Sequence, residues 1–229
     1  MLRYFDVRGI RLAAAVSGTP GATPLILLHG GGSDSSTWDE VTPAFTATHQ
    51  VYALDQRGFG ATSRGGPYGF QPMCDDVLGL LDVLGVQRCD LAGHSMGGTV
   101  AWLAAQQQPD RVTHLVIEDS PPPCRGRFRS SVTIGQPPDA PFDWAAVQAY
   151  VRDLESPDPR WWDQVGAVTA PTLLLAGGAC SPVPQDLFGD VLDKLPHGQL
   201  VEIPVGHNIH RDAPQAFTEA VTTFLSSTR

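Results

Sequence analysis

Short apolar runs alternate with segments of helical spacing along most of the chain, and this alternation restricts the possible folds more than any other feature. The runs long enough for buried strands are residues 25–28, 51–54, 89–93, 112–117, 172–176 and 199–203. Runs without polar alternation are typical of strands whose two faces are both covered by helices. The pattern therefore predicts an α/β fold with a mostly parallel sheet between two helical layers.

The remaining segments extend this organisation. Residues 4–7 and 10–16 predict an N-terminal hairpin around Arg8 and Gly9. Helices are predicted over 38–48, 72–84, 96–108, 184–195 and 213–225. Between about 120 and 160, prolines interrupt the pattern around one helical segment at 144–154. We therefore expect a single domain, residues 1–229, with a short insertion at about 120–160.

The composition argues against several classes of protein. Hydrophobic residues make up 42% of the chain and charged residues 17%, which is ordinary for a globular domain and unlike a disordered one. The net charge of −9 argues against a nucleic-acid partner, because phosphate binding needs a basic face. The one basic run, Arg125, Arg127 and Arg129, is too short to change this. We expect a small-molecule substrate, no nucleic-acid or membrane partner, and a monomer or homodimer.

Cysteine spacing and apolar run length bear on location. The four cysteines form no CxxC pair, so neither a zinc knuckle nor a redox dithiol is indicated. No apolar run is long enough for a membrane span, and the first residues lack the apolar core of a signal peptide. These features predict a cytoplasmic protein. Lys194 is the only lysine beside many arginines, a usage that suggests a GC-rich bacterial genome.

The most informative motif is GHSMGG at residues 93–98, which follows one predicted strand and opens a predicted helix. It matches G-x-S-x-G, in which a serine nucleophile stands on a tight turn between a strand and a helix. Side chains at Gly93 and Gly97 would collide with neighbouring backbone, and the free N–H groups of the helix favour developing negative charge. The motif identifies Ser95 as the candidate nucleophile.

A second glycine-rich segment, HGGG at residues 29–32, also lies at a strand end. A loop without Cβ atoms lets backbone N–H groups approach a substrate oxygen, and an oxyanion hole needs two such donors. We expect these donors to be the N–H groups of Met96 and of Gly31, with Gly32 as the alternative to Gly31. A nucleotide-binding loop is not indicated, because the chain has neither a GxGxxG nor a P-loop pattern here.

The candidate general base is His207, which comes just after the last predicted strand. A serine hydroxyl needs a base to take its proton during attack, and in G-x-S-x-G enzymes the histidine comes last along the chain. His210, three residues further on, suits a structural role better. The spacing of the two histidines permits a shared metal, but no acidic or cysteine ligands accompany them. No metal or organic cofactor is therefore expected.

Together HGGG, DxRGxG at residues 55–60, GHSMGG and the late His207 resemble the α/β-hydrolase superfamily over about residues 10–225. The resemblance implies an eight-stranded, mostly parallel sheet and a triad of serine, acid and histidine. It also implies a cap inserted after the sixth strand, which fits residues 120–160. A serine nucleophile implies the serine hydrolase branch and excludes the dehalogenase and epoxide-hydrolase branches, whose nucleophile is an aspartate.

The acid departs from the pattern of many relatives, which carry it just after the seventh strand. In this chain the corresponding loop, residues 177–182, contains no carboxylate. Another branch of the superfamily places the acid at the end of the sixth strand, where this chain has Asp119. Asp119 is therefore the favoured residue to orient His207. Asp186 and Glu118 stay open as alternatives, as does a site without an acid.

Residues close to these motifs are candidates for secondary roles. Trp38 and His94 are predicted to line the substrate pocket, with core packing an equal alternative for Trp38. Asp55 and Arg57 are expected to fix the turn after their strand by hydrogen bonds. The pair Trp161-Trp162 could contact either the core or the substrate.

The motifs predict hydrolysis of a small or medium carboxylic ester, lactone or thioester through an acyl-enzyme on Ser95. An alternative within the same fold is a C–C hydrolase, lyase, isomerase or cyclase of secondary metabolism or aromatic degradation. A further alternative is a ligand receptor on a hydrolase scaffold, whose mark would be a broken triad or a blocked site. Fold alone does not fix the substrate.

Overall fold

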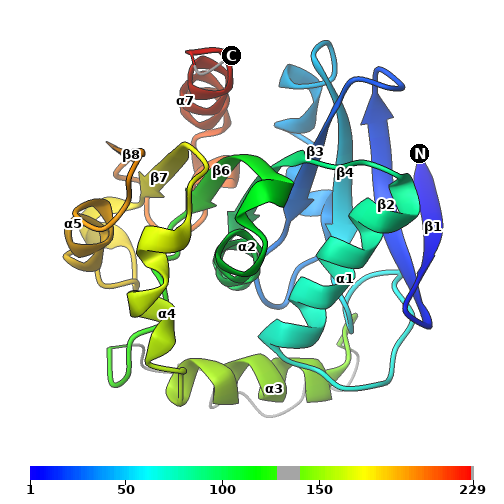
Figure 1. The fold of residues 1–229 in the computed structure, drawn as a ribbon, viewed down its shortest axis with the longest axis horizontal. Helices are drawn as coiled ribbons and strands as arrows, with labels where there is room; N and C mark the ends of the chain where they lie inside the picture. The colour runs from blue at the N-terminus through cyan, green and yellow to red at the C-terminus, as the bar shows by residue number, and fades with distance from the viewer. Residues whose placement is uncertain (128–139, 228–229) are drawn as a thin grey trace.

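A computed structural model describes residues 1–127 and 140–227, and its strands form one eight-stranded sheet in the order β1-β2-β4-β3-β5-β6-β7-β8 (Figure 1). The strands are β1 (Leu2–Val7), β2 (Ile10–Gly18), β3 (Thr23–Leu28), β4 (His49–Asp55), β5 (Cys89–His94), β6 (Val112–Glu118), β7 (Thr172–Ala176) and β8 (Gly198–Glu202). Strand β2 is antiparallel to β1 and β4, and the other pairings in the described residues are parallel. The predicted mostly parallel sheet is confirmed.

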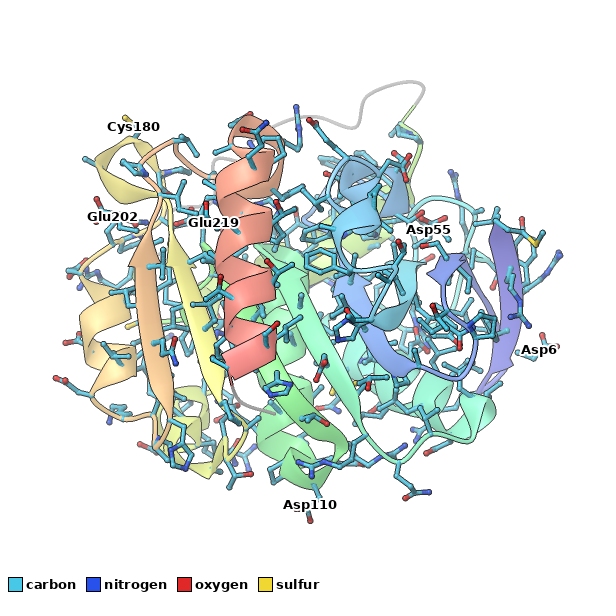
Figure 2. The ribbon with its side chains drawn as sticks, turned by 90° about the horizontal axis from the view of Figure 1, so that it is seen from above. Asp6, Asp55, Asp110, Cys180, Glu202 and Glu219 are labelled. Atoms are coloured by element: carbon cyan, nitrogen blue, oxygen red, sulfur yellow. The ribbon has the colours of Figure 1, made fainter. Side chains whose placement is uncertain are left out.

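Helices cover both faces of this sheet. Helices α1 (Phe70–Leu84) and α2 (Met96–Gln107) pack on one face, and α7 (Pro214–Ser227), which carries Glu219, lies along the other (Figure 2). In β3, Ile26 and Leu28 belong to the core under α1 and α2, whereas Leu25 and Leu27 belong to the core under α7. All four side chains are buried, because successive residues of a strand point to opposite faces.

The helix predicted over residues 38–48 is absent, so this prediction is wrong. Two short 3-10 turns, Ser35–Trp38 and Thr42–Ala44, form there instead. Pro43 has no N–H to donate into a continuing α-helix. The Thr42 hydroxyl also donates to the Trp38 carbonyl at 2.8 Å, which competes with a helical hydrogen bond to that carbonyl.

The connection from β6 to β7 carries the predicted insertion. Its described part contains α3 (Trp144–Glu155), which matches the helix predicted at 144–154, and α4 (Arg160–Asp163). Residues 128–139, and with them Arg129 and the middle of the predicted insertion, lie outside the described residues. Helix α3 crosses one end of the molecule (Figure 1). That the whole chain forms one domain, with an insertion bounded near 120 and 160, stays a prediction.

The remaining α-helices of the described residues are short, namely α5 (Leu187–Leu192) and α6 (Ile209–Asp212), and three 3-10 helices lie at Pro109–Arg111, Val165–Ala167 and Gly178–Cys180. The helix predicted over 184–195 is correctly placed but is too long. The side chain of Gln185 bonds to the backbone of Gly178 and Val183, which holds the residues before α5 in a turn. Within residues 1–127 and 140–227, none of the helices has the length and apolar character needed to span a bilayer.

Candidate active site

Ser95 stands on the turn between β5 and α2. Its φ of 52° and ψ of −117° lie outside the regions that residues with a side chain ordinarily adopt. Close packing holds this conformation, since a Cβ on Gly93 would lie 2.5 Å from the carbonyl carbon of Gly97. A Cβ on Gly97 would lie 2.6 Å from the carbonyl oxygen of His29. Glycine is required at both positions, as the motif indicates.

Three side chains from three strand ends form one hydrogen-bonded chain. Ser95 Oγ lies 2.9 Å from Nε2 of His207, and Nδ1 of His207 lies 2.7 Å from Oδ2 of Asp119. The three residues follow β5, β8 and β6, and parallel strands bring their carboxyl ends to the same edge of the sheet. With Asp119 ionised, Nδ1 carries the proton and Nε2 accepts from the serine hydroxyl. The arrangement can move a proton from Ser95 to His207 during nucleophilic attack.

Asp119 is fully buried, and the loop after β7 supplies donors that keep it ionised. Its Oδ1 accepts hydrogen bonds from the Gly177 N–H and the Gln185 amide, both at 3.0 Å, and its Oδ2 accepts one from the Ser181 hydroxyl. Burial by itself raises the pKa of Asp119, but the hydrogen bonds from His207 and these three donors lower it below its ordinary value. The segment after β7, which contributes no acid to the triad, therefore supplies the hydrogen-bond donors that hold Asp119 after the neighbouring strand β6.

A cavity of about 190 Å³ opens beside Ser95. Its wall includes Gly31, Met96 and His207, and α3 contributes Tyr150. The Met96 N–H opens α2 and so has no acceptor in a preceding turn. In the described part of the chain the Gly31 N–H also donates to no oxygen. Both backbone groups are available to a substrate oxygen, whereas Gly32, the alternative donor, is not part of the cavity wall.

Glu118, an alternative acid, belongs to a second buried pair. Both of its oxygens lie 2.8 Å from Nδ1 of His210, and Nε2 of His210 lies 2.7 Å from the hydroxyl of Thr37. Burial raises the pKa of Glu118, but the nearby His94 and the hydrogen bonds from His210 lower it overall. Glu118 is therefore committed to His210, in the structural role expected for that histidine.

Asp186, the other alternative acid, is an exposed residue that forms an ion pair with Arg127. Of the three candidate carboxylates, Asp119 is the one that contacts His207. The idea of a metal shared by His207 and His210 also finds no support, because each histidine binds its own carboxylate. Among the residues with described positions, no group of three or more His, Cys, Asp or Glu side chains could hold a metal ion.

Trp38 and His94 lie away from the cavity wall, which corrects the prediction that they contact substrate. Trp38 is buried against His210, with ring centroids 4.3 Å apart. His94 is also buried, and its Nε2 lies 2.8 Å from the backbone oxygen of His207. Burial lowers the pKa of His94 to about 4, even though the charge of Glu118 opposes this, so the ring is neutral and Nε2 donates. His94 therefore positions the loop that carries His207.

Asp55 and Arg57 have structural contacts. Asp55 accepts hydrogen bonds from the N–H groups of Ser35 and Ala61, both at 2.8 Å, so it fixes the turn after β4 as expected. Arg57 instead forms a buried ion pair with Asp76 and ties that turn to α1.

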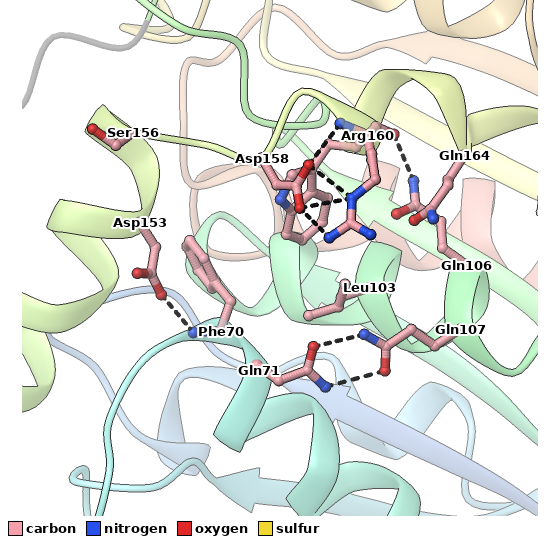
Figure 3. A pocket seen from close by; sticks show the side chains of 11 residues that line it. Phe70, Gln71, Leu103, Gln106, Gln107, Asp153, Ser156, Asp158, Arg160 and Gln164 are labelled. Atoms are coloured by element: carbon pink, nitrogen blue, oxygen red, sulfur yellow. Dashed lines mark hydrogen bonds and ion pairs between the residues drawn. The ribbon is translucent and has the colours of Figure 1, made fainter.

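A cavity of about 380 Å³, twice the volume of the one at Ser95, lies between α1, α2, α3 and α4 (Figure 3). Polar side chains around it largely satisfy one another, as in the pairs Gln71–Gln107 and Asp158–Arg160. Trp161 packs against Phe70 of α1 in its wall and so joins the insertion to the core, whereas Trp162 donates to the Pro123 carbonyl within the same connection. The lining includes no histidine to activate a nucleophile, so we place the candidate active site in the smaller cavity.

Four residues of the site are not predicted from the sequence, namely Tyr150, Leu154, Ser181 and Gln185. Ser181 and Gln185 hold Asp119 from a loop that the sequence marks only by its missing acid, and a search there for hydrogen-bond donors would have found them. Tyr150 and Leu154 both line the cavity from α3. Their spacing of four residues places them on one face of a helix, and this was the available signal.

The chain belongs to the α/β hydrolase fold family, because the family model described as "alpha/beta hydrolase fold" matches residues 23–145. Epoxide hydrolase B of Mycobacterium tuberculosis is 31% identical over 196 residues, which cover 83% of this chain and 51% of that protein. The chain spans about a third to a half of the length of the first curated relatives that it matches. These relatives are hydrolases.

Solved structures show the same fold. A hydrolase from Pseudomonas aeruginosa is 26% identical, with a TM-score of 0.83 and 98% of each chain covered. The enol-lactonase from Burkholderia xenovorans is 22% identical, with a TM-score of 0.79 over 98% of this chain and 100% of that one. At this identity the second likeness concerns the fold alone.

Proposed function

We propose that the protein is a serine hydrolase that cleaves a small or medium carboxylic ester, lactone or thioester through an acyl-enzyme on Ser95. The observation that carries the proposal is the hydrogen-bonded chain from Ser95 through His207 to Asp119 at the wall of a cavity. A serine hydroxyl is a weak nucleophile until such a base is adjacent to it. The free N–H groups of Gly31 and Met96 supply the electrostatic support that acyl transfer needs.

In the first half-reaction, the Ser95 oxygen forms a bond to the carbonyl carbon while its proton passes to Nε2 of His207. The carbonyl electron pair moves onto the oxygen, which the N–H groups of Gly31 and Met96 receive. When this intermediate collapses, the bond to the leaving oxygen or sulfur breaks and His207 returns the proton to that atom. Asp119 stays negatively charged throughout and stabilises the imidazolium form of His207.

In the second half-reaction, water attacks the acyl-enzyme and His207 takes a proton from that water. The bond between the acyl carbon and Ser95 then breaks, and the proton returns to the Ser95 oxygen. The products are a carboxylic acid and the free enzyme. Every step uses only the substrate, water and the named residues, so the proposed reaction requires no metal or organic cofactor.

The size of the cavity supports a small substrate. Pockets for drug-sized ligands usually have volumes of roughly 300 to 1,000 Å³, and the cavity at Ser95 has about 190 Å³. A short acyl chain fits this space better than a long one.

The names of the relatives support hydrolysis as the reaction type. One sequence relative is named an epoxide hydrolase, but that branch of the superfamily is expected to use an aspartate, and this chain has Ser95 on the turn. One structural neighbour is an enol-lactonase, and this name agrees with the ester and lactone chemistry proposed here.

Hydrolysis of p-nitrophenyl acetate, γ-butyrolactone and acetylthiocholine tests the proposal in wild-type protein and in Ser95→Ala. We expect turnover of at least one of these compounds, and a loss of kcat of at least about 10⁴-fold in the variant. Equal turnover by Ser95→Ala would contradict the proposed nucleophile. No turnover of any of the three would favour the C–C hydrolase, lyase, isomerase or cyclase alternative.

A further inference from the structure

The insertion places a phenol in the cavity beside Ser95. Helix α3 directs Tyr150 into the cavity wall that also contains Gly31 and Met96. A Cβ built on Gly31 would collide with the Tyr150 hydroxyl oxygen and would lie 2.8 Å from the ring carbon Cζ. The hydroxyl therefore lies directly against the backbone segment that borders Ser95, and a glycine at position 31 is what permits this approach.

Packing fixes the position of this phenol. The Tyr150 ring contacts the ring of Phe70, with centroids 6.3 Å apart. The start of α3 is held by Asp143, which accepts hydrogen bonds from the Ala145 N–H at 3.0 Å and from the Tyr68 hydroxyl at 2.6 Å. A ring held by the core on one side and by a capped helix on the other keeps its hydroxyl near Gly31.

The Tyr150 hydroxyl has no hydrogen-bond partner among the residues whose positions are described, although the side chain is partly buried. The Tyr68 hydroxyl differs, since it accepts from the Gly65 N–H and donates to Asp143, both at 2.6 Å. Burial raises the pKa of Tyr150, so the phenol keeps its proton at neutral pH. It is therefore a free donor that faces the reaction space.

We propose that the Tyr150 hydroxyl donates a third hydrogen bond to the oxyanion that forms when Ser95 attacks its substrate. This inference rests on the proposed function and adds a catalytic residue from the insertion. In this step the bond from Ser95 to the carbonyl carbon forms, the carbonyl electron pair moves onto oxygen, and the Ser95 proton goes to His207. Tyr150 keeps its own proton and contacts the oxygen on which the charge develops.

Tyr150→Phe removes the oxygen and keeps the ring. With the ester that the wild type hydrolyses, we expect kcat to fall by about 10- to 100-fold and KM to change by less than about 3-fold, because the bond is made in the transition state. A boronic acid inhibitor, which forms a tetrahedral adduct with an activated serine, should bind more weakly by a similar factor. Tyr4→Phe, which removes the hydroxyl of an exposed tyrosine on β1, is the matched control. It should leave kcat, KM and the affinity for the boronic acid unchanged.

An unchanged kcat in Tyr150→Phe, or a raised KM with unchanged kcat, would overturn this inference while Ser95→Ala still tests the proposed function separately. If Tyr150→Phe does not fold, a fluorinated tyrosine at position 150 preserves the shape and acidifies the phenol. In that protein kcat should fall as the pH rises and the phenol loses its proton, and a profile equal to that of the wild type would contradict the inference. A wild-type protein that turns over none of the ester, lactone and thioester compounds would remove the proposed function and this inference together.

Discussion

Two histidine–carboxylate pairs lie side by side where β6 ends, and they are built from neighbouring residues. Glu118 and Asp119 are consecutive, and His207 and His210 are three residues apart. In both pairs Nδ1 of the histidine meets the carboxylate, at 2.8 Å for His210 and at 2.7 Å for His207. By this criterion alone either pair qualifies as the acid and base of a serine hydrolase.

The pairs differ in what the second ring nitrogen meets. Nε2 of His210 contacts the Thr37 hydroxyl, and the His210 side chain is 1% exposed. Nε2 of His207 contacts the Ser95 hydroxyl at a cavity wall, and the His207 side chain is 25% exposed. A histidine–carboxylate pair can thus be a structural crosslink or an activating base. Access to a cavity, a hydroxyl on a strained turn and nearby backbone donors decide which role is possible.

Replacing His207 and His210 in turn should produce the largest difference in activity between the two pairs. In His207→Ala we expect kcat to fall by at least about 10⁴-fold, because the Ser95 proton loses its acceptor. In His210→Ala, kcat should stay within about 10-fold of the wild-type value, since Nε2 of His210 faces Thr37 and not the cavity. Steady-state ester hydrolysis measures both, and an equal loss in the two folded variants would contradict the division of roles.

The two carboxylates provide the next test. Asp119→Asn should lower kcat by about 10³- to 10⁴-fold, because the amide no longer holds His207 in the tautomer that accepts the Ser95 proton. Glu118→Gln should instead lower the free energy of unfolding by about 1.5 to 3 kcal/mol, through weaker hydrogen bonds to His210. Kinetics and urea unfolding of both variants check this. A large activity loss confined to Glu118→Gln would reverse the assignment.

The ring of His94 lies between the two pairs, with its centroid 4.7 Å from that of His207 and 5.0 Å from that of His210. We expect the burial of this ring to make the folding stability depend on pH. Burial lowers the pKa of His94 from 6.5 to about 4 in the folded protein. As the pH falls from 6.5 towards 4, the unfolded chain therefore binds a proton that the folded chain does not, and folding stability decreases.

The expected size of this decrease is on the order of 3 kcal/mol, and urea unfolding between pH 4 and 7 measures it. His94→Gln should show a flatter profile over this range, because glutamine does not titrate. His197→Gln, at an exposed histidine, is the matched control and should keep the wild-type slope. The proposed role of burial at His94 fails if the three profiles coincide.

The smallest expected effect concerns the donors around Asp119. Ser181→Ala removes one hydrogen bond to Oδ2 while the Gln185 and Gly177 donors stay, so kcat should fall by less than about 10-fold. Cys180→Ala changes the exposed neighbour in the same turn and should have no effect. Parallel assays of the two variants decide the point. Identical rates would show that Gln185 and Gly177 suffice to hold the acid.

Much of the site could be predicted because its requirements are local. Gly93 and Gly97 are needed by backbone contacts at one turn, and apolar runs before Ser95 and Asp119 mark the strands that end there. Parallel strands then bring residues that follow those ends to one edge, so Ser95, Asp119 and His207 could be selected from the sequence.

The rest depends on contacts between distant segments. Trp38 lies only six residues after Gly32, the end of the HGGG loop. In the folded chain α6 and α7 pack against the Trp38 ring and bury it away from the cavity. Tyr150 comes from an insertion more than a hundred residues after Gly31, and only the folded chain brings its hydroxyl to that glycine. The four-residue spacing of Tyr150 and Leu154 indicates a shared helix face, but no periodicity or short motif indicates which segment that face meets.

The most direct test of the central claim is labelling with a fluorophosphonate probe, followed by mass spectrometry of the modified residue. The probe reacts with a serine whose hydroxyl is activated beside an oxyanion hole. We predict modification at Ser95 in the wild type and in His210→Ala, and its loss in His207→Ala. Absence of labelling at Ser95 in folded wild-type protein, or labelling that survives in His207→Ala, would contradict the account.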